Sequence, residues 1–367
     1  MQRERSLEDL IAGWEGVGVV SRFDRETGSW FFVALHSDAL GTPTGGTRLA
    51  SYPAPADGLM DAMRLAAGMT AKWAAAGIGF GGAKAVIAVP GSLEGEARRG
   101  LLRRYGALVE SLHGSFRTGE DLGTTPEDME QIASATSYVL GVAGDGGGPL
   151  TDPGPFTARG VLLCQRAALA HLFGDGDPAG RHVVIQGVGD VGGPLARSLA
   201  AAGAHLTLAD VDAGRAAALA AEIGAATVAP DAVYDVECDL FAPCAVGAVL
   251  NAGTIPRLAC RGVAGSANNQ LAGDDDAARL LARGILYAPD YVTNAGGAIA
   301  FARLVADPHA PADDLYARVE RLEATMGEIL AEAAARGESP LAAAHRRVER
   351  ALAAARDDGR TAAGRGR

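Results

Sequence analysis

Residues 182–202 restrict the possible fold more than any other part of the sequence. They begin with a short apolar strand at 182–186, pass through a glycine-rich turn and continue into an alanine-rich helix. Alternation of strand and helix is typical of a parallel sheet with helical crossovers. We therefore predict a doubly wound α/β sheet, with further strands at 206–209, 240–241, 262–264 and 286–287.

The glycine-rich turn has the spacing G-x-G-x-x-G. Glycines at these positions allow a tight turn, and they let a pyrophosphate approach the N-terminus of the next helix. Asp190 is an acid close to this predicted pyrophosphate, so we expect its side chain to point away. The predicted cofactor contacts along the turn are Gly187, Val188, Gly189, Asp190 and Val191.

Asp210 ends the strand that follows the turn and its helix. A carboxylate at this place can accept hydrogen bonds from the adenosine ribose hydroxyls, and it repels a 2′-phosphate. We therefore predict NAD rather than NADP as the cofactor, bound beside Asp210 and Val211.

Residues 45–84 form a second unusual stretch, in which Lys72 and Lys84 lie among glycines and alanines. Desolvation and a nearby like charge both favour the neutral amine of a lysine. The pair is therefore a candidate for general base chemistry, whereas none of the seven histidines lies in a loop typical of a catalytic histidine. Around the lysines we predict a loop at 41–47, a helix at 57–76 and a strand at 85–89.

Length and composition limit the remaining possibilities. A chain of 367 residues predicts two domains. The net charge of −11 argues against nucleic acid as a partner. The four cysteines lack the spacing of a metal site, so we expect no metal. The sequence shows neither a membrane span nor a secretory signal, so we expect a cytoplasmic protein without a membrane partner.

A run of glycine and proline at 141–155 has no helical or strand periodicity and predicts a linker between the domains. Residues 313–356 have a helical pattern that breaks at 337–340. The last residues, 357–367, are rich in glycine, arginine and alanine, and we predict that they are disordered.

Seven motifs, in order along the chain, resemble those of the glutamate, leucine, phenylalanine and valine dehydrogenases. They are G-G-T-R at 45–48, G-M-T-A-K at 68–72, G-G-A-K at 81–84, E-D-L-G-T-T at 120–125, F-A-P-C-A at 241–245, G-S-A-N-N-Q at 265–270 and Y-A-P-D-Y-V-T-N-A-G-G at 287–297. The resemblance implies a substrate and oligomerisation domain at 1–145, a Rossmann-type NAD-binding domain at 146–329 and a cleft between them. It also implies C-terminal helices, at about 330–356, packed on the first domain, and a homo-oligomer of two or more chains.

The resemblance implies NAD-dependent, reversible oxidative deamination of an L-amino acid to a 2-oxo acid and ammonia. Lys72 matches the lysine that binds the substrate α-carboxylate. Lys84 matches the catalytic lysine, a general base for the attacking water, and Asp121 matches the aspartate that takes and returns the amine proton. Further matches are Gly46 and Asn269 as substrate contacts, and Thr157, Asn268 and Arg48 as cofactor contacts.

Four residues bear on which amino acid is the substrate. Glutamate enzymes of this family have a lysine where this chain has Thr44, which argues against glutamate. Gly119 and Ala298 match phenylalanine enzymes, and Phe301 offers a ring for stacking. We therefore predict phenylalanine or another aromatic amino acid, with leucine or valine as the alternative; Thr44 could also recognise a substrate hydroxyl.

Two other classes of function stay open at this point. A non-catalytic NAD-binding homologue would be expected to lose a lysine or Asp121, and this chain keeps all three residues. A hydroxy-acid dehydrogenase would act on a 2-hydroxy acid without ammonia.

Overall fold

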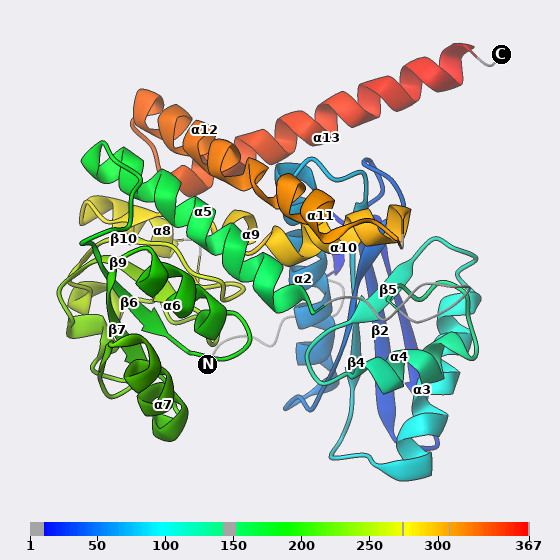
Figure 1. Ribbon diagram of the computed structural model, residues 1–367. Helices are drawn as coiled ribbons and strands as arrows, with labels where there is room; N and C mark the ends of the chain where they lie inside the picture. Colours follow the sequence, from blue (N-terminus) through cyan, green and yellow to red (C-terminus); the bar gives the residue numbers. More distant parts are fainter. Residues whose placement is uncertain (1–10, 142–151, 274, 308, 366–367) are drawn as a thin grey trace, which may run out of the picture. The chain divides into compact units, whose positions relative to one another are not determined.

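The computed structural model describes residues 11–141, 152–273, 275–307 and 309–365 (Figure 1). Contacts within the chain divide it into two compact units. Unit 1 consists of residues 1–150 and 350–367, and unit 2 consists of residues 151–349. Most of the predicted linker and the predicted domain boundary at 145/146 fall in 142–151, outside the described residues.

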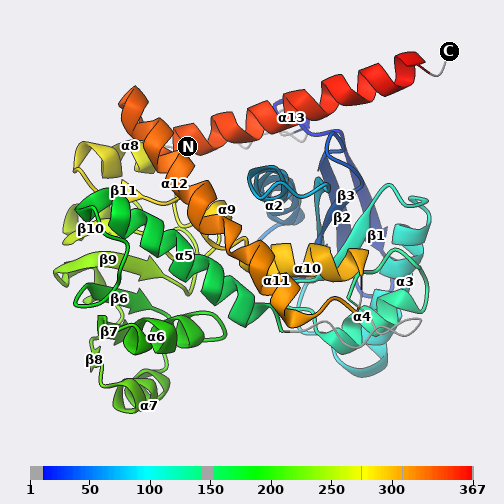
Figure 2. The ribbon, with the colours of Figure 1, turned by 45° about the horizontal axis from the view of Figure 1, so that its top comes forward.

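Unit 1 contains a five-stranded mixed sheet in the order β1-β2-β4-β3-β5. The strands are β1 (Gly18–Asp24), β2 (Ser29–Ser37), β3 (Pro43–Ala50), β4 (Gly81–Ala88) and β5 (Arg117–Glu120). Strand β2 pairs antiparallel with β1 and β4, whereas β3 pairs parallel with β4 and β5. Helix α2 (Pro55–Ala75) lies on one side of this sheet, and α3 (Gly95–Glu110) and α4 (Pro126–Ala133) lie on the other (Figures 1 and 2).

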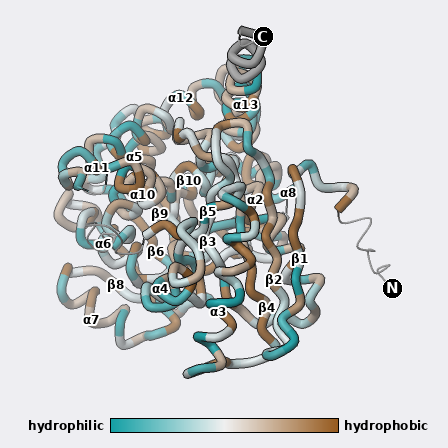
Figure 3. The backbone as a smooth tube through the Cα atoms, turned by 90° about the vertical axis from the view of Figure 1, so that its right-hand side faces the viewer, coloured by the Kyte–Doolittle hydropathy of each residue, from teal (hydrophilic) through white to brown (hydrophobic). Residues whose placement is uncertain are grey.

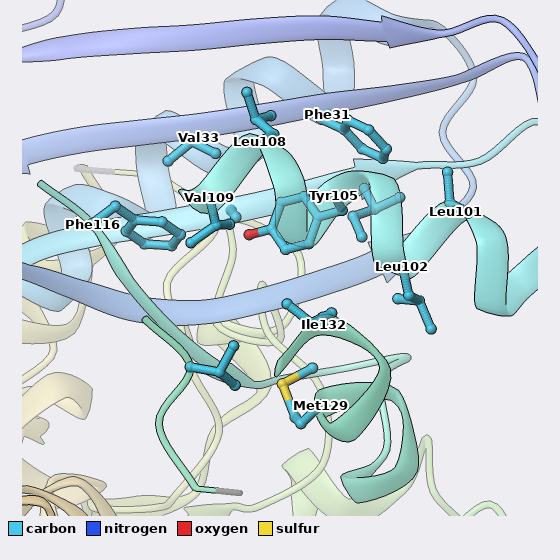
Figure 4. Packing of buried hydrophobic residues seen from close by; sticks show 14 of the residues in the cluster. Phe31, Val33, Leu101, Leu102, Tyr105, Leu108, Val109, Phe116, Met129 and Ile132 are labelled. Atoms are coloured by element: carbon cyan, nitrogen blue, oxygen red, sulfur yellow. The ribbon is translucent and has the colours of Figure 1, made fainter. Parts of the chain in front are cut away.

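Strand β4 is the centre of unit 1, because all of its residues are buried. Alternate side chains of a strand point to opposite faces of the sheet. Ala85 and Ile87 accordingly join the core against α3 and α4, and Val86 joins the core against α2. Figure 3 shows hydrophobic stretches along β2 and β4, and Figure 4 shows Tyr105 and Phe116 among aliphatic side chains on the α3 side.

The predicted loop at 41–47 was wrong, because Pro43–Ala50 forms strand β3. Glycines disfavour strands when they are considered alone. Here the two strands that flank β3 supply backbone pairing on both of its edges. A Cβ atom at Gly45 would come within 1.7 Å of the Ala83 carbonyl oxygen. The close contact between β3 and β4 therefore requires glycine. The low strand propensity of glycine is also what led to the loop prediction.

Unit 2 contains a six-stranded sheet, parallel throughout, in the order β11-β10-β9-β6-β7-β8. The strands are β6 (His182–Gln186), β7 (His205–Ala209), β8 (Ala226–Thr227), β9 (Cys238–Pro243), β10 (Cys260–Val263) and β11 (Leu286–Tyr287). Numbered from β6, this order is 3-2-1-4-5-6, that of a Rossmann dinucleotide-binding fold. The predicted doubly wound sheet is confirmed.

Helices cover both faces of this sheet. Helices α5 (Pro153–Phe173) and α6 (Gly192–Ala201) lie on one side of β6, as Figure 2 shows. On the other side, residues of η1, η2 and α8 form a core with Phe241 and Val263. The remaining elements up to residue 306 are α7 (Ala213–Ile223), η1 (Val233–Asp235), η2 (Ile255–Arg257), α8 (Asp275–Ala282), α9 (Asp290–Thr293) and α10 (Gly296–Ala306).

The C-terminal part is helical, as α11 (Ala312–Val319), α12 (Arg321–Arg336) and α13 (Pro340–Arg365). The predicted break at 337–340 is confirmed, since α12 ends at Arg336 and Gly337 follows it in a left-handed conformation. Helix α13 extends into the segment 357–367 for which the sequence predicted disorder. No helix among the described residues is both long and apolar enough to cross a membrane.

Candidate functional site

Lys84 lies in the middle of the central strand β4 and is 5% exposed. Its neighbours Ala83 and Ala85 point toward α3, so Lys84 points to the opposite face, which α2 covers. Lys84 Nζ lies 2.5 Å from Asp121 Oδ1. The structure therefore brings together the two residues that the sequence predicted to be catalytic.

The approach of Lys84 to Asp121 depends on glycine at position 46. Strand β3 lies between β4, which carries Lys84, and β5, after which Asp121 follows. A Cβ atom at Gly46 would lie 2.9 Å from Asp121 Cβ and 2.6 Å from the Glu120 carbonyl oxygen. Gly46 is also in register with Gly119 on β5, so two adjacent strands lack a side chain beside the Lys84–Asp121 pair.

The charge of Asp121 is stabilised by two cations. Its Oδ1 accepts from Lys84, and its Oδ2 accepts from Arg48 Nε at 3.1 Å. Burial raises the pKa of Asp121, but the charges and hydrogen bonds of Lys84 and Arg48 outweigh burial and hold that pKa below its usual value. Asp121 is therefore a carboxylate at neutral pH. The cofactor contact expected of Arg48 stays a prediction.

The loop after β5 holds the backbone of Asp121. Thr124 Oγ1 accepts from the Asp121 backbone N–H at 3.0 Å and lies 3.1 Å from the Thr47 carbonyl oxygen on β3. Helix α4 begins directly afterwards, with Thr125 and Asp128 in a capping box. Thr125 is therefore the N-cap of α4. Thr124 was missed by the sequence interpretation, although the repeated threonine before an N-cap is a signal that could have identified it.

Thr44 is buried, and its hydroxyl donates to the Thr42 carbonyl oxygen at 2.9 Å. Its own carbonyl oxygen accepts from Trp73 Nε1 at 3.1 Å. Thr44, Gly46 and Arg48 alternate along β3 and so share one face of the sheet. Because the Thr44 hydroxyl proton is bonded within the chain, the part of Thr44 left for a substrate is its methyl group and the oxygen lone pairs.

Lys72 lies near the C-terminal end of α2, directly before Trp73. Residues spaced by three or four positions share one face of a helix. Asp61, Leu65, Gly68 and Lys72 have this spacing, so Lys72 shares a helical stripe with Asp61.

The glycine-rich turn in unit 2 follows β6 at the place where the strand order reverses, between β6 and β9. Gly187 has a φ of +92°, and a Cβ atom there would lie 2.7 Å from Ala245 Cβ. A Cβ atom at Gly192 would lie 1.9 Å from the Gly187 carbonyl oxygen. A Cβ atom at Gly189 would meet nothing closer than Arg215 at 3.9 Å, which leaves the backbone open to a pyrophosphate. The turn therefore fits a dinucleotide.

Asp210 stabilises this turn through hydrogen bonds to its backbone. Its Oδ2 accepts from the Val188 backbone N–H at 2.8 Å, and its Oδ1 accepts from the Asp212 backbone N–H at 2.9 Å. Val211 beside it is 93% exposed, and Asp190 is also exposed. A carboxylate oxygen accepts more than one hydrogen bond. Asp210 can therefore keep these bonds and still accept from a ribose hydroxyl.

Arg215 was missed by the sequence interpretation. Its Nη1 lies 3.9 Å from Asp210 Oδ2, in the first turn of α7. A cation opposes the helix dipole at an N-terminus, and this position could have drawn attention to it. Arg215 places a positive charge where the sequence interpretation considered only the negative charge of Asp210.

The remaining predicted residues of unit 2 lie on α5, on α10 and in the segment before α8. Thr157 donates to the Pro153 carbonyl oxygen at 2.9 Å, and a Cβ atom at Gly297 would lie 2.6 Å from Thr157 Oγ1. Ala298 and Phe301 are half-buried and one turn apart on α10.

Asn268 and Asn269 have distinct local geometries. Asn268 Oδ1 accepts from Asn294 Nδ2 at 2.8 Å, which leaves the Asn268 amide N–H groups for another acceptor. Asn269 has a φ of +51°, a conformation that asparagine tolerates better than most residues.

Two family models match the chain. The model described as Glu/Leu/Phe/Val dehydrogenase, dimerisation domain, matches residues 24–138. The model described as Glutamate/Leucine/Phenylalanine/Valine dehydrogenase matches residues 210–337. The first match contains Lys72, Lys84 and Asp121, and the second begins at Asp210.

Individual relatives agree with the family models. A leucine dehydrogenase of Thermoactinomyces intermedius is 44% identical over 276 residues, 75% of each chain. A phenylalanine dehydrogenase of Lysinibacillus sphaericus is 37% identical over 334 residues, 90% of this chain and 86% of the relative. The crystal structure of an L-tryptophan dehydrogenase from Nostoc punctiforme superposes with a TM-score of 0.81 at 34% identity, covering 96% of this chain and all of that one.

Proposed function

The chain belongs to the glutamate/leucine/phenylalanine/valine dehydrogenase family, and we propose that it catalyses the NAD-dependent, reversible oxidative deamination of an L-amino acid. The amino acid, NAD⁺ and water are converted to a 2-oxo acid, ammonium, NADH and a proton. The observation that carries this proposal is the contact of buried Lys84 with half-buried Asp121 beside Gly46 and Gly119. Retention of this pair also argues against a non-catalytic NAD-binding homologue.

Three residues of unit 1 have a proposed task in this reaction. Lys72 binds the substrate α-carboxylate as a point charge. Asp121 is a carboxylate at neutral pH and so can take the proton of the substrate amine. Lys84 acts as general base for the water that attacks the imine carbon, and Asp121 lies within hydrogen-bonding distance to exchange protons with it. NAD, when bound, accepts the hydride of the substrate.

Unit 2 is proposed to hold the cofactor as NAD rather than NADP. The glycine turn and α6 receive the pyrophosphate, and Asp210 receives the adenosine ribose. The proposed preference for NAD rests on Asp210, whose buried carboxylate would repel a 2′-phosphate. The positive charge of Arg215 would attract a 2′-phosphate. Arg215 is more than half exposed, however, so solvent screens this attraction.

For the substrate we favour phenylalanine or another aromatic amino acid. Gly119 enlarges the space beside Lys84, and Ala298 and Phe301 lie on one side of α10. The engaged Thr44 hydroxyl also fits a substrate side chain without charge. Leucine or valine is the alternative. The relatives alone do not favour either proposal, because they include leucine dehydrogenases as well as phenylalanine and tryptophan dehydrogenases. One methylene in such a pocket changes affinity by only about 1–3 kcal/mol.

We also propose that the protein is a cytoplasmic homo-oligomer of two or more chains. The family model that matches unit 1 is described as a dimerisation domain, and this supports self-association. Light scattering of the purified protein tests it, because a monomer at micromolar concentration would contradict the proposal.

A substrate panel tests the proposed function. The twenty L-amino acids are assayed at alkaline pH with NAD and with NADP, and both reduced cofactor and ammonia are measured. We expect NADH and ammonia in equal amounts with an aromatic or branched-chain amino acid. Reduction of NAD by a 2-hydroxy acid without ammonia would instead indicate a hydroxy-acid dehydrogenase, and no product with any amino acid would contradict the proposal.

A further inference from the structure

A row of alternating charges leads from Lys84 to helix α2. Asp121 pairs with Lys84 and Arg48, and Arg48 Nη1 pairs in turn with Asp61 Oδ2 at 2.9 Å. The exposed fractions of these four side chains range from 6% to 22%. The four charges sum to zero, so the loss of one leaves an uncompensated charge in a poorly hydrated region.

Asp61 is itself firmly held. Its Oδ2 also accepts from the Tyr52 hydroxyl at 2.8 Å, and its Oδ1 accepts from Arg64 Nη2 at 2.6 Å. Burial raises the pKa of Asp61, but hydrogen bonds and charges from Arg64, Tyr52 and Arg48 outweigh burial and keep that pKa below its usual value. Asp61 is therefore a fixed anion, with Arg48 between it and Asp121.

We propose that Asp61 is a positioning residue, which holds Arg48 against Asp121 and offsets part of the charge of that guanidinium. Without Asp61, Asp121 would be the one carboxylate of this row left to face the two cations Lys84 and Arg48. A carboxylate in that field holds a proton too weakly to collect one from an amine, and proton transfer is efficient only between groups of matched affinity. The kinetic consequence of this inference rests on the proposed function, whereas the effect on Asp121 does not.

The other charged groups near Asp121 must be the same in the variant and the wild type, because each of them affects the pKa of Asp121. Lys84 faces it from β4 and Arg48 faces it from β3. Glu120 precedes it on β5, and burial together with Glu127, Asp128 and Asp121 raises the pKa of Glu120. Substitution at position 61 leaves all of these groups in place.

The test compares Asp61→Asn with the wild-type protein. The asparagine has nearly the shape of the aspartate but lacks its charge. A ¹³C NMR titration of the Asp121 carboxyl group is expected to give a pKa lower by about one pH unit in the variant. With the best amino acid substrate, kcat is expected to fall about tenfold, the acidic limb of its pH profile to move to lower pH, and the KM for NAD to change less than about twofold.

Asp57→Asn is the matched control, because it makes the same substitution one turn earlier on α2. Asp57 accepts a hydrogen bond from the Ala54 backbone N–H and is not the partner of Arg48. This control variant should leave the Asp121 titration unchanged. Asp61→Glu keeps the charge and should return the Asp121 pKa to near the wild-type value, a rescue that a merely structural role would not produce. Asp61→Ser tests the same loss of charge if the asparagine variant does not fold.

An unchanged Asp121 titration in folded Asp61→Asn would overturn the inference. If instead the wild-type protein deaminates no amino acid, the proposed function fails, and the NMR titration still decides whether Asp61 controls Asp121.

Discussion

At the scale of single residues, the candidate site depends on a glycine as much as on its charged groups. Lys84 and Asp121 are separated by strand β3, and they meet because Gly46 has no side chain between them. The sequence motifs predicted Lys84 and Asp121 as the catalytic residues, and the structure brings these two side chains together. The partnership of Arg48 with both Asp121 and Asp61 was not predicted, because it joins residues far apart in the sequence.

Gly46→Ala adds only one methyl group, but we expect it to distort the site strongly. The new Cβ atom would lie 2.6 Å from the Glu120 carbonyl oxygen, so β5 and Asp121 must shift. We expect kcat/KM to fall by a factor of at least about 100, since small misplacements of reacting groups are costly. The control is Gly327→Ala on α12, where a Cβ atom meets nothing within 4 Å and activity should be unchanged. Equal activity of Gly46→Ala and wild type would refute this account.

The charge of Asp121 also predicts a pH dependence of stability. Its pKa is lowered by folding, so its contribution is present above the unfolded value of about 3.9 and is lost as the pH falls through the folded value. Asp121→Asn should lower the free energy of unfolding at pH 7 by about 2 kcal/mol. Urea unfolding at several pH values should show this difference shrinking below about pH 4. A difference that grows toward acid pH would be inconsistent with the assigned charge.

At the scale of elements, the short helix α4 holds the loop that carries Asp121. The capping box of Thr125 and Asp128 begins α4 four residues after Asp121. A helix start of this kind can be predicted from the sequence, because capping signals are local. The sequence did not predict strand β3, because that strand depends on partners on both of its edges.

Thr125→Ala removes the cap hydroxyl that accepts from the Asp128 backbone N–H. We expect a loss of about 1 kcal/mol in the free energy of unfolding. Ser134→Ala is the control at the other end of α4, where the hydroxyl bonds the Gln131 carbonyl oxygen, and it should cost less than about 0.5 kcal/mol. Urea denaturation measures the free energy of unfolding of both variants. Equal losses of free energy would show that the Thr125 cap stabilises α4 no more than Ser134 does.

At the scale of the whole molecule, each unit carries one half of the proposed chemistry. The parallel sheet of unit 2 could be predicted because each βαβ step leaves a local pattern of strand, turn and helix. The mixed order of unit 1 could not be predicted, because β2 pairs with β4 and not with the next strand in the sequence. The family resemblance supplied the residue roles that neither pattern contains.

Loss of cofactor binding should therefore be separable from loss of proton transfer. Gly192→Ala would place a Cβ atom 1.9 Å from the Gly187 carbonyl oxygen and distort the glycine turn. Calorimetry should show NAD affinity reduced at least about tenfold in this variant. Lys84→Ala, which alters unit 1, should bind NAD as the wild type does. NAD binding at wild-type affinity by Gly192→Ala would contradict the assignment of the turn.

The most direct test of the central claim is the turnover of Lys84→Ala in the presence of NAD and the best amino acid substrate. Removal of a general base lowers turnover by a factor of about 10²–10⁴, so we expect NADH and ammonia formation to fall within or below that range. Circular dichroism and NAD affinity should match the wild type. A folded, NAD-binding Lys84→Ala protein that keeps most of the wild-type turnover would contradict the claim that the Lys84–Asp121 pair carries the reaction.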